Sequence, residues 1–148
     1  MNLRWTQESL PQWDHDKARV VGGAGPEVFE PSLLDRPEGT LLPSDWWHVE
    51  SEDGKTVAYG WMDVTWGDAE IGLAVDPEFQ RQGIGTFILD NLEHEAAARG
   101  INYLYNVVQP THPQQGEVSD WLKARRFSAS EDGKLLRAVV RLSKASGE

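Results

Sequence analysis

Residues 69–100 read AEIGLAVDPEFQRQGIGTFILDNLEHEAAARG, a strand signal followed by a turn signal and a helix signal. Ala69–Val75 is a short apolar run between Gly-Asp and Asp-Pro, which is how a buried strand is typically bounded. In the second half, apolar side chains recur at helical spacing at Ile84, Phe87, Ile88, Leu92 and Ala96. Gly100 follows as a helix stop, so the stretch predicts a strand, a tight turn and an amphipathic helix.

The turn, Gln80–Thr86, has the properties of an anion-binding site. Gly83 and Gly85 remove side chains where the helix starts, which lets a ligand approach the backbone closely. The first N–H groups of a helix have no partner inside the helix, and they lie at the positive end of its dipole. Arg81 adds a formal positive charge, so the turn suits a phosphate or pyrophosphate group.

The whole stretch resembles the acyl-coenzyme A signature of the GNAT superfamily of N-acyltransferases. The core pattern of that signature, Gln/Arg-x-x-Gly-x-Gly/Ala, is met by Gln80, Gly83 and Gly85. The resemblance is close over residues 70–100 and looser from there to residue 142. It implies an α/β fold with a mixed, mostly antiparallel sheet, whose splayed parallel central strands are flanked by helices. It also implies acetyl-CoA as co-substrate and no metal.

The resemblance further implies where the cofactor binds. In the superfamily, pantetheine lies between the two splayed strands and bonds to the backbone of the first. Carried over by position, its contacts are Leu73, Ala74 and Val75. The pyrophosphate is held mostly by main-chain N–H groups, and the corresponding residues are Arg81, Gln82, Gly83, Ile84, Gly85 and Thr86.

The N-terminal part of the chain gives weaker signals. Leu3–Thr6 is a candidate first strand, and Ser9–Gln12 resembles a capped helix start with an early proline. That helix is expected to end near Val21. From Gly22 to Pro43, glycines and prolines break the chain so often that only short helical turns fit.

Beyond this loop, two hairpins and a crossover are expected. Asp45–Glu50 and Thr56–Thr65 form the first hairpin around an Asp-Gly turn. After the central helix come a strand at Ile101–Val108, a short helix at Glu117–Arg125, and a closing hairpin before Leu135–Leu142. The helical crossover makes strands 69–75 and 101–108 parallel.

Length and composition bound the protein class. The 148 residues are most simply one domain, and the absence of cysteine excludes disulfides, thiolate metal sites and cysteine nucleophiles. No apolar run approaches the length of a membrane helix, and the N-terminus lacks the features of a secretion signal. We therefore expect a soluble cytoplasmic protein. Dimerisation is common in the superfamily, so a homodimer is one assembly that the resemblance allows.

The net charge of −10 lies entirely in residues 1–76, because residues 77–148 hold equal numbers of acidic and basic side chains. Nucleic acid is not expected as a partner, since binding phosphates needs a basic face. Two interpretations of the acidic half stay open. It keeps the protein soluble, or it presents a negative field to a cationic acceptor.

Acyl transfer to an amine requires loss of an amine proton, stabilisation of an oxyanion and departure of the thiolate. Many superfamily members supply the acid from a tyrosine five residues before a Gly-Phe pair. Counting back from Phe127, the tyrosine position is Leu122 and the glycine position is Arg126. The usual acid is therefore missing here.

Three other residues are candidates for proton transfer. Glu70 lies on the strand beside the expected thioester, although relatives that use a strand glutamate carry it one place earlier, at Ala69 here. His112 could deprotonate an ammonium near neutral pH, and Tyr105 could donate a proton to sulfur. Each also has an ordinary structural interpretation. Glu70 could be a solvent-facing strand residue, His112 a histidine that bonds nearby loop backbone, and Tyr105 an ordinary strand aromatic. Four tryptophans are candidates for an acceptor cleft or for core and hairpin packing, namely Trp46, Trp47, Trp61 and Trp66.

These observations predict an acetyl-CoA-dependent N-acetyltransferase that acts on a primary amine of a small molecule or peptide by direct attack on the thioester. The alternative is a non-catalytic module that binds acyl-CoA or regulates another protein, which the missing tyrosine favours. A nucleotide-binding protein that uses Gly83 and Gly85 is a weaker third interpretation, because neither a strand–helix repeat nor an acidic ribose partner is evident.

Overall fold

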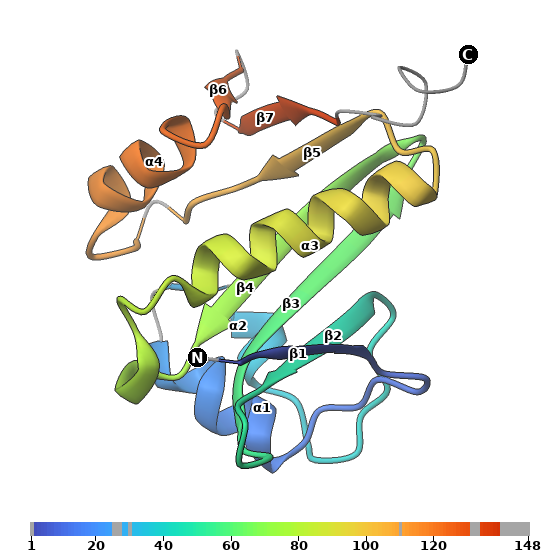
Figure 1. The fold of residues 1–148 in the computed structure, drawn as a ribbon, viewed down its shortest axis with the longest axis vertical. Coiled ribbons are helices and arrows are strands. Elements are labelled where there is room, and N and C mark those ends of the chain that lie inside the picture. The colour runs from blue at the N-terminus through green and yellow to red at the C-terminus, as the bar shows by residue number, and fades with distance from the viewer. Residues whose placement is uncertain (1, 25–27, 30, 110, 131–133, 140–148) are drawn as a thin grey trace.

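The computed structural model describes residues 2–24, 28–29, 31–109, 111–130 and 134–139. Within these residues, seven strands form one sheet in the order β1-β2-β3-β4-β5-β7-β6 (Figure 1). The strands are β1 (Arg4–Gln7), β2 (Asp45–Glu50), β3 (Thr56–Thr65), β4 (Asp68–Val75), β5 (Tyr103–Asn106), β6 (Ser128–Ala129) and β7 (Leu135–Ala138). Neighbouring strands are antiparallel except for β4 and β5, which are parallel. The predicted mixed sheet with a parallel central pair is confirmed.

The helices are α1 (His15–Val20), α2 (Pro31–Leu34), α3 (Ile84–Ala98) and α4 (Gln115–Lys123), with short 3₁₀ turns η1 (Gly22–Ala24) and η2 (Pro77–Phe79). The helix predicted from residues 69–100 is α3, and its C-terminal stop at Gly100 has a left-handed φ of 73°. In its described residues, the broken segment after Val21 forms only the short helical elements η1 and α2, as expected. The part of the predicted closing hairpin at residues 131–133 and 140–142 lies outside the described residues.

The start predicted for the first helix is wrong. Ser9–Gln12 does not begin it, because Gln12 forms an isolated bridge with Leu41. The helix begins only at His15, where the Asp14 side chain accepts a hydrogen bond of 2.8 Å from the Lys17 N–H. Its end agrees with the prediction.

The sheet separates two hydrophobic clusters. Side chains of α3 pack on one face of β3 and β4, with Ile88, Leu89 and Leu92 fully buried. The opposite face packs against α1 and the chain that follows it, around Trp46 and Tyr59. Period-two alternation along β4 supplies both faces, because Ile71 faces the α3 side and Ala74 the α1 side.

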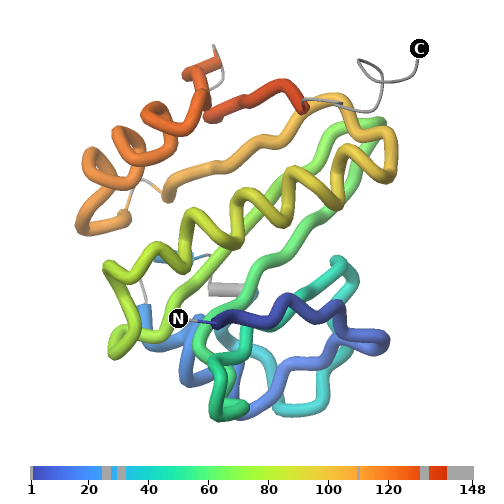
Figure 2. The backbone as a smooth tube through the Cα atoms, in the orientation of Figure 1, coloured from blue at the N-terminus to red at the C-terminus, as the bar shows by residue number. Residues whose placement is uncertain are grey.

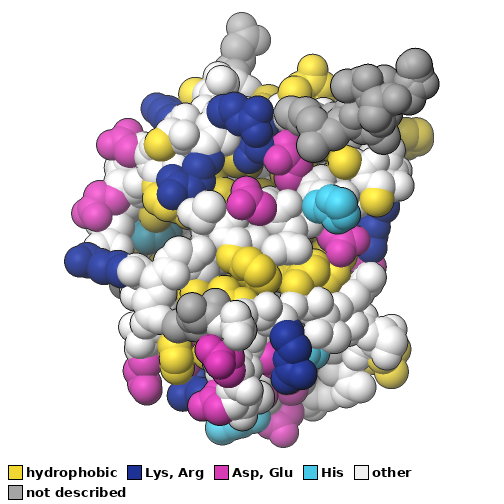
Figure 3. Space-filling view, viewed as in Figure 1, with side chains coloured by type: hydrophobic (Ala, Val, Ile, Leu, Met, Phe, Trp, Pro, Cys, Tyr) yellow, Lys and Arg dark blue, Asp and Glu magenta, His cyan; other side chains and the backbone are white. Residues whose placement is uncertain are grey.

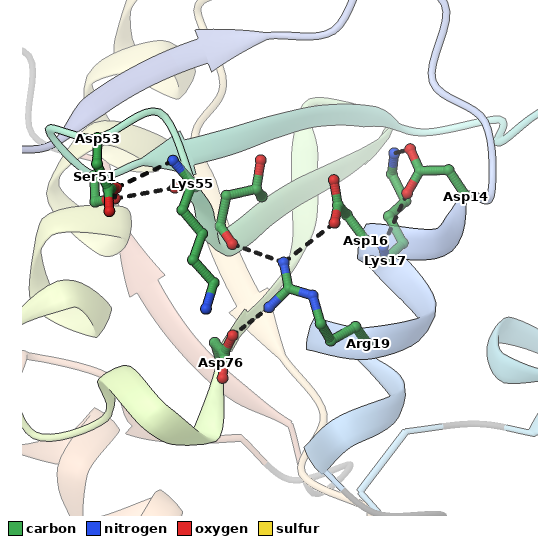
Figure 4. A network of polar contacts seen from close by, with 9 residues as sticks. Asp14, Asp16, Lys17, Arg19, Ser51, Asp53, Lys55 and Asp76 are labelled. Carbon is green, nitrogen blue, oxygen red and sulfur yellow. Dashed lines mark hydrogen bonds and ion pairs between the residues drawn. The ribbon is translucent and has the colours of Figure 1, made fainter.

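Helix α1 is tied to the end of β4 by Arg19. Its guanidinium donates to the carboxylates of Asp76 and Asp16, and also to the Thr56 carbonyl at 2.9 Å (Figure 4). Asp76 in turn accepts from the Glu78 N–H at 2.9 Å and so caps η2. This network fixes the direction in which the chain leaves β4 toward the turn at Gln80–Thr86.

Lys17 is fully buried behind Trp46 and Tyr59. Its ammonium pairs with Glu8 at 2.7 Å and Asp14 at 3.0 Å, and Figure 4 shows it beside Asp14. Glu8 also bonds His48 Nδ1 at 3.1 Å. This cluster stabilises the α1 side of the sheet because each buried charge has a partner.

The Glu8–His48 pair predicts a pH dependence of stability. The hydrogen bond with Glu8 raises the pKa of His48, against the opposing effect of burial. A group whose pKa is raised by folding stabilises the fold below its unfolded pKa, here 6.5, and this contribution is lost as the pH rises through the folded pKa. We expect the free energy of unfolding of the parent chain to fall as the pH rises above 6.5. In urea titrations, His48→Gln should lack that decline, and an equal decline in both proteins would contradict the assignment.

Glu8 predicts that the free energy of unfolding also falls on the acid side. Burial raises the pKa of Glu8, but its hydrogen bonds with His48 and Lys17 outweigh this and hold the pKa below the usual 4.5. This contribution is present above 4.5 and is lost as the pH falls through the folded pKa. The same urea titrations, extended to acid, should show stability falling on that side.

No helix in the described ranges is long and apolar enough to cross a membrane.

Candidate functional site

The ladder between β4 and β5 is short. It pairs Asp68 with Tyr103, Ala69 with Leu104 and Glu70 with Tyr105, and ends there. The next contact is made by a side chain, since the Asn106 amide donates to the Ile71 carbonyl at 2.8 Å. Figures 1 and 2 show β5 and α4 diverging from β4 toward the N-terminal end of α3. The two parallel strands are therefore splayed.

The splay leaves the edge of β4 exposed. The Ile71 carbonyl faces β5, whereas the Asp76 N–H faces β3 and donates to the Val57 carbonyl at 2.8 Å. Because successive residues of a strand direct their backbone groups to opposite sides, Leu73 and Val75 direct theirs to the side that β5 has left. Of the expected pantetheine contacts, these two therefore present backbone groups. Ala74 instead faces β3 and packs its side chain in the α1-side core.

The N-terminus of α3 opens at the same place. Its N-cap, Gly83, has a left-handed φ of 79°, makes no side-chain cap, and is followed by no acidic residue in the first turn. The first intrahelical bond of this turn runs from the Phe87 N–H to the Gly83 carbonyl at 3.0 Å. The N–H groups of Ile84, Gly85 and Thr86 precede it, so the positive end of the helix dipole is available to an anion.

Gly85 has a packing reason for its size that the sequence did not indicate. A Cβ atom there would lie 3.2 Å from Cζ2 of Trp121, which is on α4. A Cβ atom at Gly83 would meet nothing within 4 Å. Glycine at position 83 is therefore favoured by its left-handed backbone conformation. Glycine at position 85 allows α4 to pack closely on the start of α3.

Arg125 is a cation at this end that sequence reasoning missed. Its guanidinium lies 4.1 Å from the centroid of the Trp121 ring and donates to Thr86 Oγ1 at 3.1 Å. It also donates to the Trp121 carbonyl at 3.0 Å. Thr86 and Arg125 are 39 residues apart in the sequence, so no local pattern reveals the contact.

A cleft of about 850 Å³ joins these features and crosses the sheet through the splay. Its donor end is lined by the exposed edge of β4, the turn before α3, Trp121 of α4, and Arg125, which follows α4. All of the residues expected to bind the cofactor line it except Gln82. Its other end, on the α1 side, is lined by Val28, Phe29, Leu33, Trp61, Asp63 and Glu70, among others.

Glu70 belongs to the α1-side end and lies where that end meets the splay of β4 and β5. It is exposed, lines the cleft and occupies the last position at which β4 pairs with β5. On the other side it is in register with Asp63 of β3. Since Glu70 and Ala69 alternate, Glu70 points to the α1 side while Ala69 is buried under α3.

Tyr105 is in register with Glu70 but lies outside the cleft lining. Burial and the negative charges of Glu70, Asp63 and Asp68 raise its pKa, so the hydroxyl stays protonated. The Lys134 ammonium lies 4.8 Å from the centre of its ring. The structure thus brings Tyr105 near Glu70, but not into the cleft.

His112 lines the cleft. Its Nδ1 accepts a hydrogen bond of 2.9 Å from the backbone N–H of Gln114. Because Nδ1 accepts, the neutral ring carries its proton on Nε2. In this arrangement His112 offers a donor to the cleft rather than a free base.

Leu122 and Arg126 occupy the positions where the resemblance expects tyrosine and glycine. Leu122 lines the cleft and is otherwise buried in the α3-side core. Arg126 has a left-handed φ of 73°, a conformation that favours glycine. The backbone conformation associated with glycine is therefore kept although the residue differs.

Charges of both signs surround the site. On the face shown in Figure 3, lysine and arginine side chains are interspersed with acidic ones. Among the residues that the structure describes, no group of three or more His, Asp or Glu side chains could hold a metal ion.

Comparison with known sequences gives one family match and two informative relatives. A family model described as "Acetyltransferase (GNAT) family" matches residues 4–119. The chain is 24% identical to mycothiol acetyltransferase from Nocardiopsis dassonvillei over 113 residues. This alignment covers 76% of this chain and 34% of that protein. It is 33% identical to the ribosomal protein bS18-alanine N-acetyltransferase from Escherichia coli over 63 residues. This alignment covers 42% of this chain and 43% of that protein. The matches span less than half of either relative.

Comparison with solved structures shows the same fold. The ribosomal-protein-S18-alanine N-acetyltransferase from Escherichia coli matches with a TM-score of 0.62 and 17% identity, over 92% of this chain and 94% of that one. A phosphinothricin acetyltransferase from Sinorhizobium meliloti, solved in complex with AcCoA, matches with a TM-score of 0.57 and 16% identity, over 89% of each chain.

Proposed function

This chain belongs to the acetyltransferase (GNAT) family, and from that premise we propose that it transfers an acetyl group from acetyl-CoA to a primary amine. The observation that carries the proposal is the cleft that crosses the sheet at the splay of β4 and β5. One end offers backbone groups and an uncapped helix N-terminus, and the other offers an apolar and acidic surface. A thioester and an amine that enter from opposite ends meet beside Glu70.

We propose that the donor end binds the cofactor as the resemblance implies. Leu73 and Val75 bond pantetheine through their backbone, and Ala74 lies between them. The N–H groups from Arg81 to Thr86 receive the pyrophosphate, helped by the positive helix end. Arg125, just after α4, adds a charge-assisted contact, because Thr86 and Trp121 already hold its guanidinium in place.

The chemistry that follows needs no covalent enzyme intermediate. Glu70 accepts a proton from the acceptor ammonium, directly or through water. The amine nitrogen then bonds to the acetyl carbon, and β4 N–H groups stabilise the oxyanion. When the intermediate collapses, the C–S bond breaks and coenzyme A leaves as the thiol after taking up a proton. Tyr105 lies outside the cleft lining, so it does not contact the substrates. Its role is limited to the surroundings of Glu70, with which it is in register.

The test combines binding with turnover. Calorimetry with coenzyme A should show one site per chain, and an amine panel with acetyl-CoA should release free thiol. The acceptor is expected to be cationic, because Asp63 and Glu70 line its end of the cleft. Raising the salt concentration should therefore lower kcat/KM for a cationic acceptor more than for a neutral one.

A non-catalytic acyl-CoA-binding module remains the second candidate. It is favoured by the apolar side chain of Leu122, because many relatives carry at this position a tyrosine that acts as the general acid. The two candidates separate cleanly, because a binding module takes up coenzyme A and releases no thiol with any amine.

His112 is expected to contribute a hydrogen bond rather than proton abstraction. His112→Ala should lower kcat/KM about tenfold, in the range expected for losing one hydrogen bond to a charged group. His112→Gln keeps a side-chain N–H and should recover most of this loss. A loss of about 10²-fold in both variants would instead identify His112 as the general base. Steady-state thiol release over a range of amine concentrations, from below to above KM, measures kcat/KM for both variants.

A further inference from the structure

The α1-side end of the cleft carries an aromatic surface that the donor does not need. Phe29, Trp46 and Trp61, here termed the aromatic wall, form a continuous set of rings. The rings of Trp46 and Trp61 stack with centroids 4.4 Å apart and an interplanar angle of 16°. Phe29 tilts against Trp61 at 5.5 Å. Trp46 is fully buried, so a ligand meets only Trp61 and Phe29.

The wall lies directly against the reactive part of β4. Trp61 is paired with Gly72, and its indole occupies the space of a side chain there, since a Cβ atom on Gly72 would lie 2.2 Å from Trp61 Cε2. Gly72 is two residues beyond Glu70 on the same face of the strand. A ligand group packed on Trp61 is therefore beside the point where β4 and β5 separate.

The wall is supported from behind. Trp46 packs edge-on against Tyr59 at 5.9 Å, and the buried Lys17 ammonium lies 5.5 Å from the Trp46 ring centroid. Glu8 and Asp14 hold Lys17 in place. Because the rings are already ordered, a ligand that packs on them does not incur the entropy cost of ordering them.

Acidic side chains adjoin the wall. Asp63 follows Trp61 by two residues on β3, so both point to the same face, and Asp63 is directly opposite Glu70. Both carboxylates are exposed and line the cleft. The cation Arg36 lines the same cleft, and a ligand ammonium that lies between the two carboxylates is attracted to both of them.

We propose that the acceptor is a primary amine carried on a flat aromatic body, an arylalkylamine in the simplest case. Its ring packs on Trp61 and Phe29, and its ammonium lies between Asp63 and Glu70, which faces the nitrogen toward the thioester. In the transfer, the nitrogen bonds to the acetyl carbon, the C–S bond breaks, and the products are an N-acetyl arylalkylamine and the coenzyme A thiol. This assignment rests on the proposed acetyl transfer.

The experiment compares amines that carry similar charge but differ in shape. Phenethylamine should exceed cyclohexylethylamine about tenfold in kcat/KM, which corresponds to about 1.4 kcal/mol and to the upper range for an aromatic pair. Spermidine, which has more charge and no ring, should be a poorer acceptor than either. Equal values for phenethylamine and spermidine, or a preference for spermidine, would overturn the assignment.

Two wall variants and one charge variant locate the effect. Trp61→Leu and Phe29→Leu should each bring the ratio of phenethylamine to cyclohexylethylamine close to one, with the affinity for coenzyme A unchanged. Phe29→Leu decides the point if Trp61→Leu does not fold, because Phe29 is only partly buried. Asp63→Asn should raise KM for both amines about tenfold or less, whereas Glu38→Gln, an exposed acid outside the cleft lining, should leave it unchanged. An unchanged amine ratio in Phe29→Leu would contradict the role of the wall.

Calorimetry separates this inference from the proposed function. If acetyl-CoA binds but no amine releases thiol, acetyl transfer to amines fails. Binding of phenethylamine to the coenzyme A complex then tests the wall directly, and its loss in Phe29→Leu would support the assignment without turnover. Absence of binding in the parent chain would overturn it.

Discussion

Glu70→Gln is expected to lower kcat for acetyl transfer by about 10²-fold or more, the usual loss when a general base is removed. Glu70 lines the cleft at the last pairing position of β4 and β5, where the donor and acceptor ends meet. Glutamine keeps the size of the side chain but cannot take up a proton. Because Glu70 is exposed, the change leaves the core intact, so the variant should fold normally. Thiol release at saturating acetyl-CoA and amine measures the effect.

Asp68→Asn is the matched control. Asp68 lies two residues earlier on β4 and therefore faces the same side, and the substitution changes the charge equally, but Asp68 does not line the cleft. Its kcat should stay within about twofold of the parent, because Asp68 does not line the cleft and its charge is partly screened by solvent. Equal losses in the two variants would point to a general field effect, and full activity of Glu70→Gln would assign proton removal to water alone.

The elements nearest the splay were predictable because their signals are local. β4 and α3 follow from apolar runs and periodicity within residues 69–100, and the β2–β3 hairpin follows from its Asp-Gly turn. The parallel pairing follows from a helical crossover. The start of α1 was missed because a long-range bridge between Gln12 and Leu41 overrides the local resemblance of Ser9–Gln12 to a helix cap.

The site was less predictable because its contacts join distant segments. Arg125 reaches Thr86 from just after another helix, and Phe29 reaches Trp61 from the loop after α1. The sequence left cleft lining and core packing open for Trp46, Trp47, Trp61 and Trp66. Trp46 and Trp47 are buried, Trp66 is exposed and outside the cleft lining, and only Trp61 of the four lines the cleft.

Fewer of the acidic side chains in residues 1–76 lie at the site than the charge of this half suggests. Several acids of residues 1–76 are committed to ion pairs within the fold, among them Glu8, Asp14, Asp16, Asp45, Glu50 and Asp76. At the cleft, the acids of this half are Asp63 and Glu70, and the cation Arg36 lines the cleft with them. The expected attraction for a cation is therefore confined to the neighbourhood of these two carboxylates, and it favours one ammonium group over an extended polyamine.

Gly83→Asn is expected to weaken coenzyme A binding by about 10-fold to 100-fold while leaving the fold intact. Gly83 has a φ of 79°, and asparagine is among the few other residues that adopt this conformation at modest cost. Valine at this position would strain the backbone, and an effect on binding could not be separated from one on folding. A Cβ atom at Gly83 meets nothing within 4 Å, so the asparagine side chain extends into the space before the helix.

The loss has a specific cause that a matched variant can isolate. The asparagine side chain extends into the open space before the first N–H groups of α3, and so obstructs the pyrophosphate that these groups receive. Each charge-assisted hydrogen bond that the cofactor forfeits is worth about 1.5–3 kcal/mol. Gly100→Asn places the same residue at a φ of 73° and in equally open space, but at the C-terminal end of α3. Calorimetry should therefore show weakened coenzyme A binding in Gly83→Asn alone, with thermal melting to verify that both variants are folded. Parent-like affinity in a folded Gly83→Asn would remove the pyrophosphate from the N-terminus of α3.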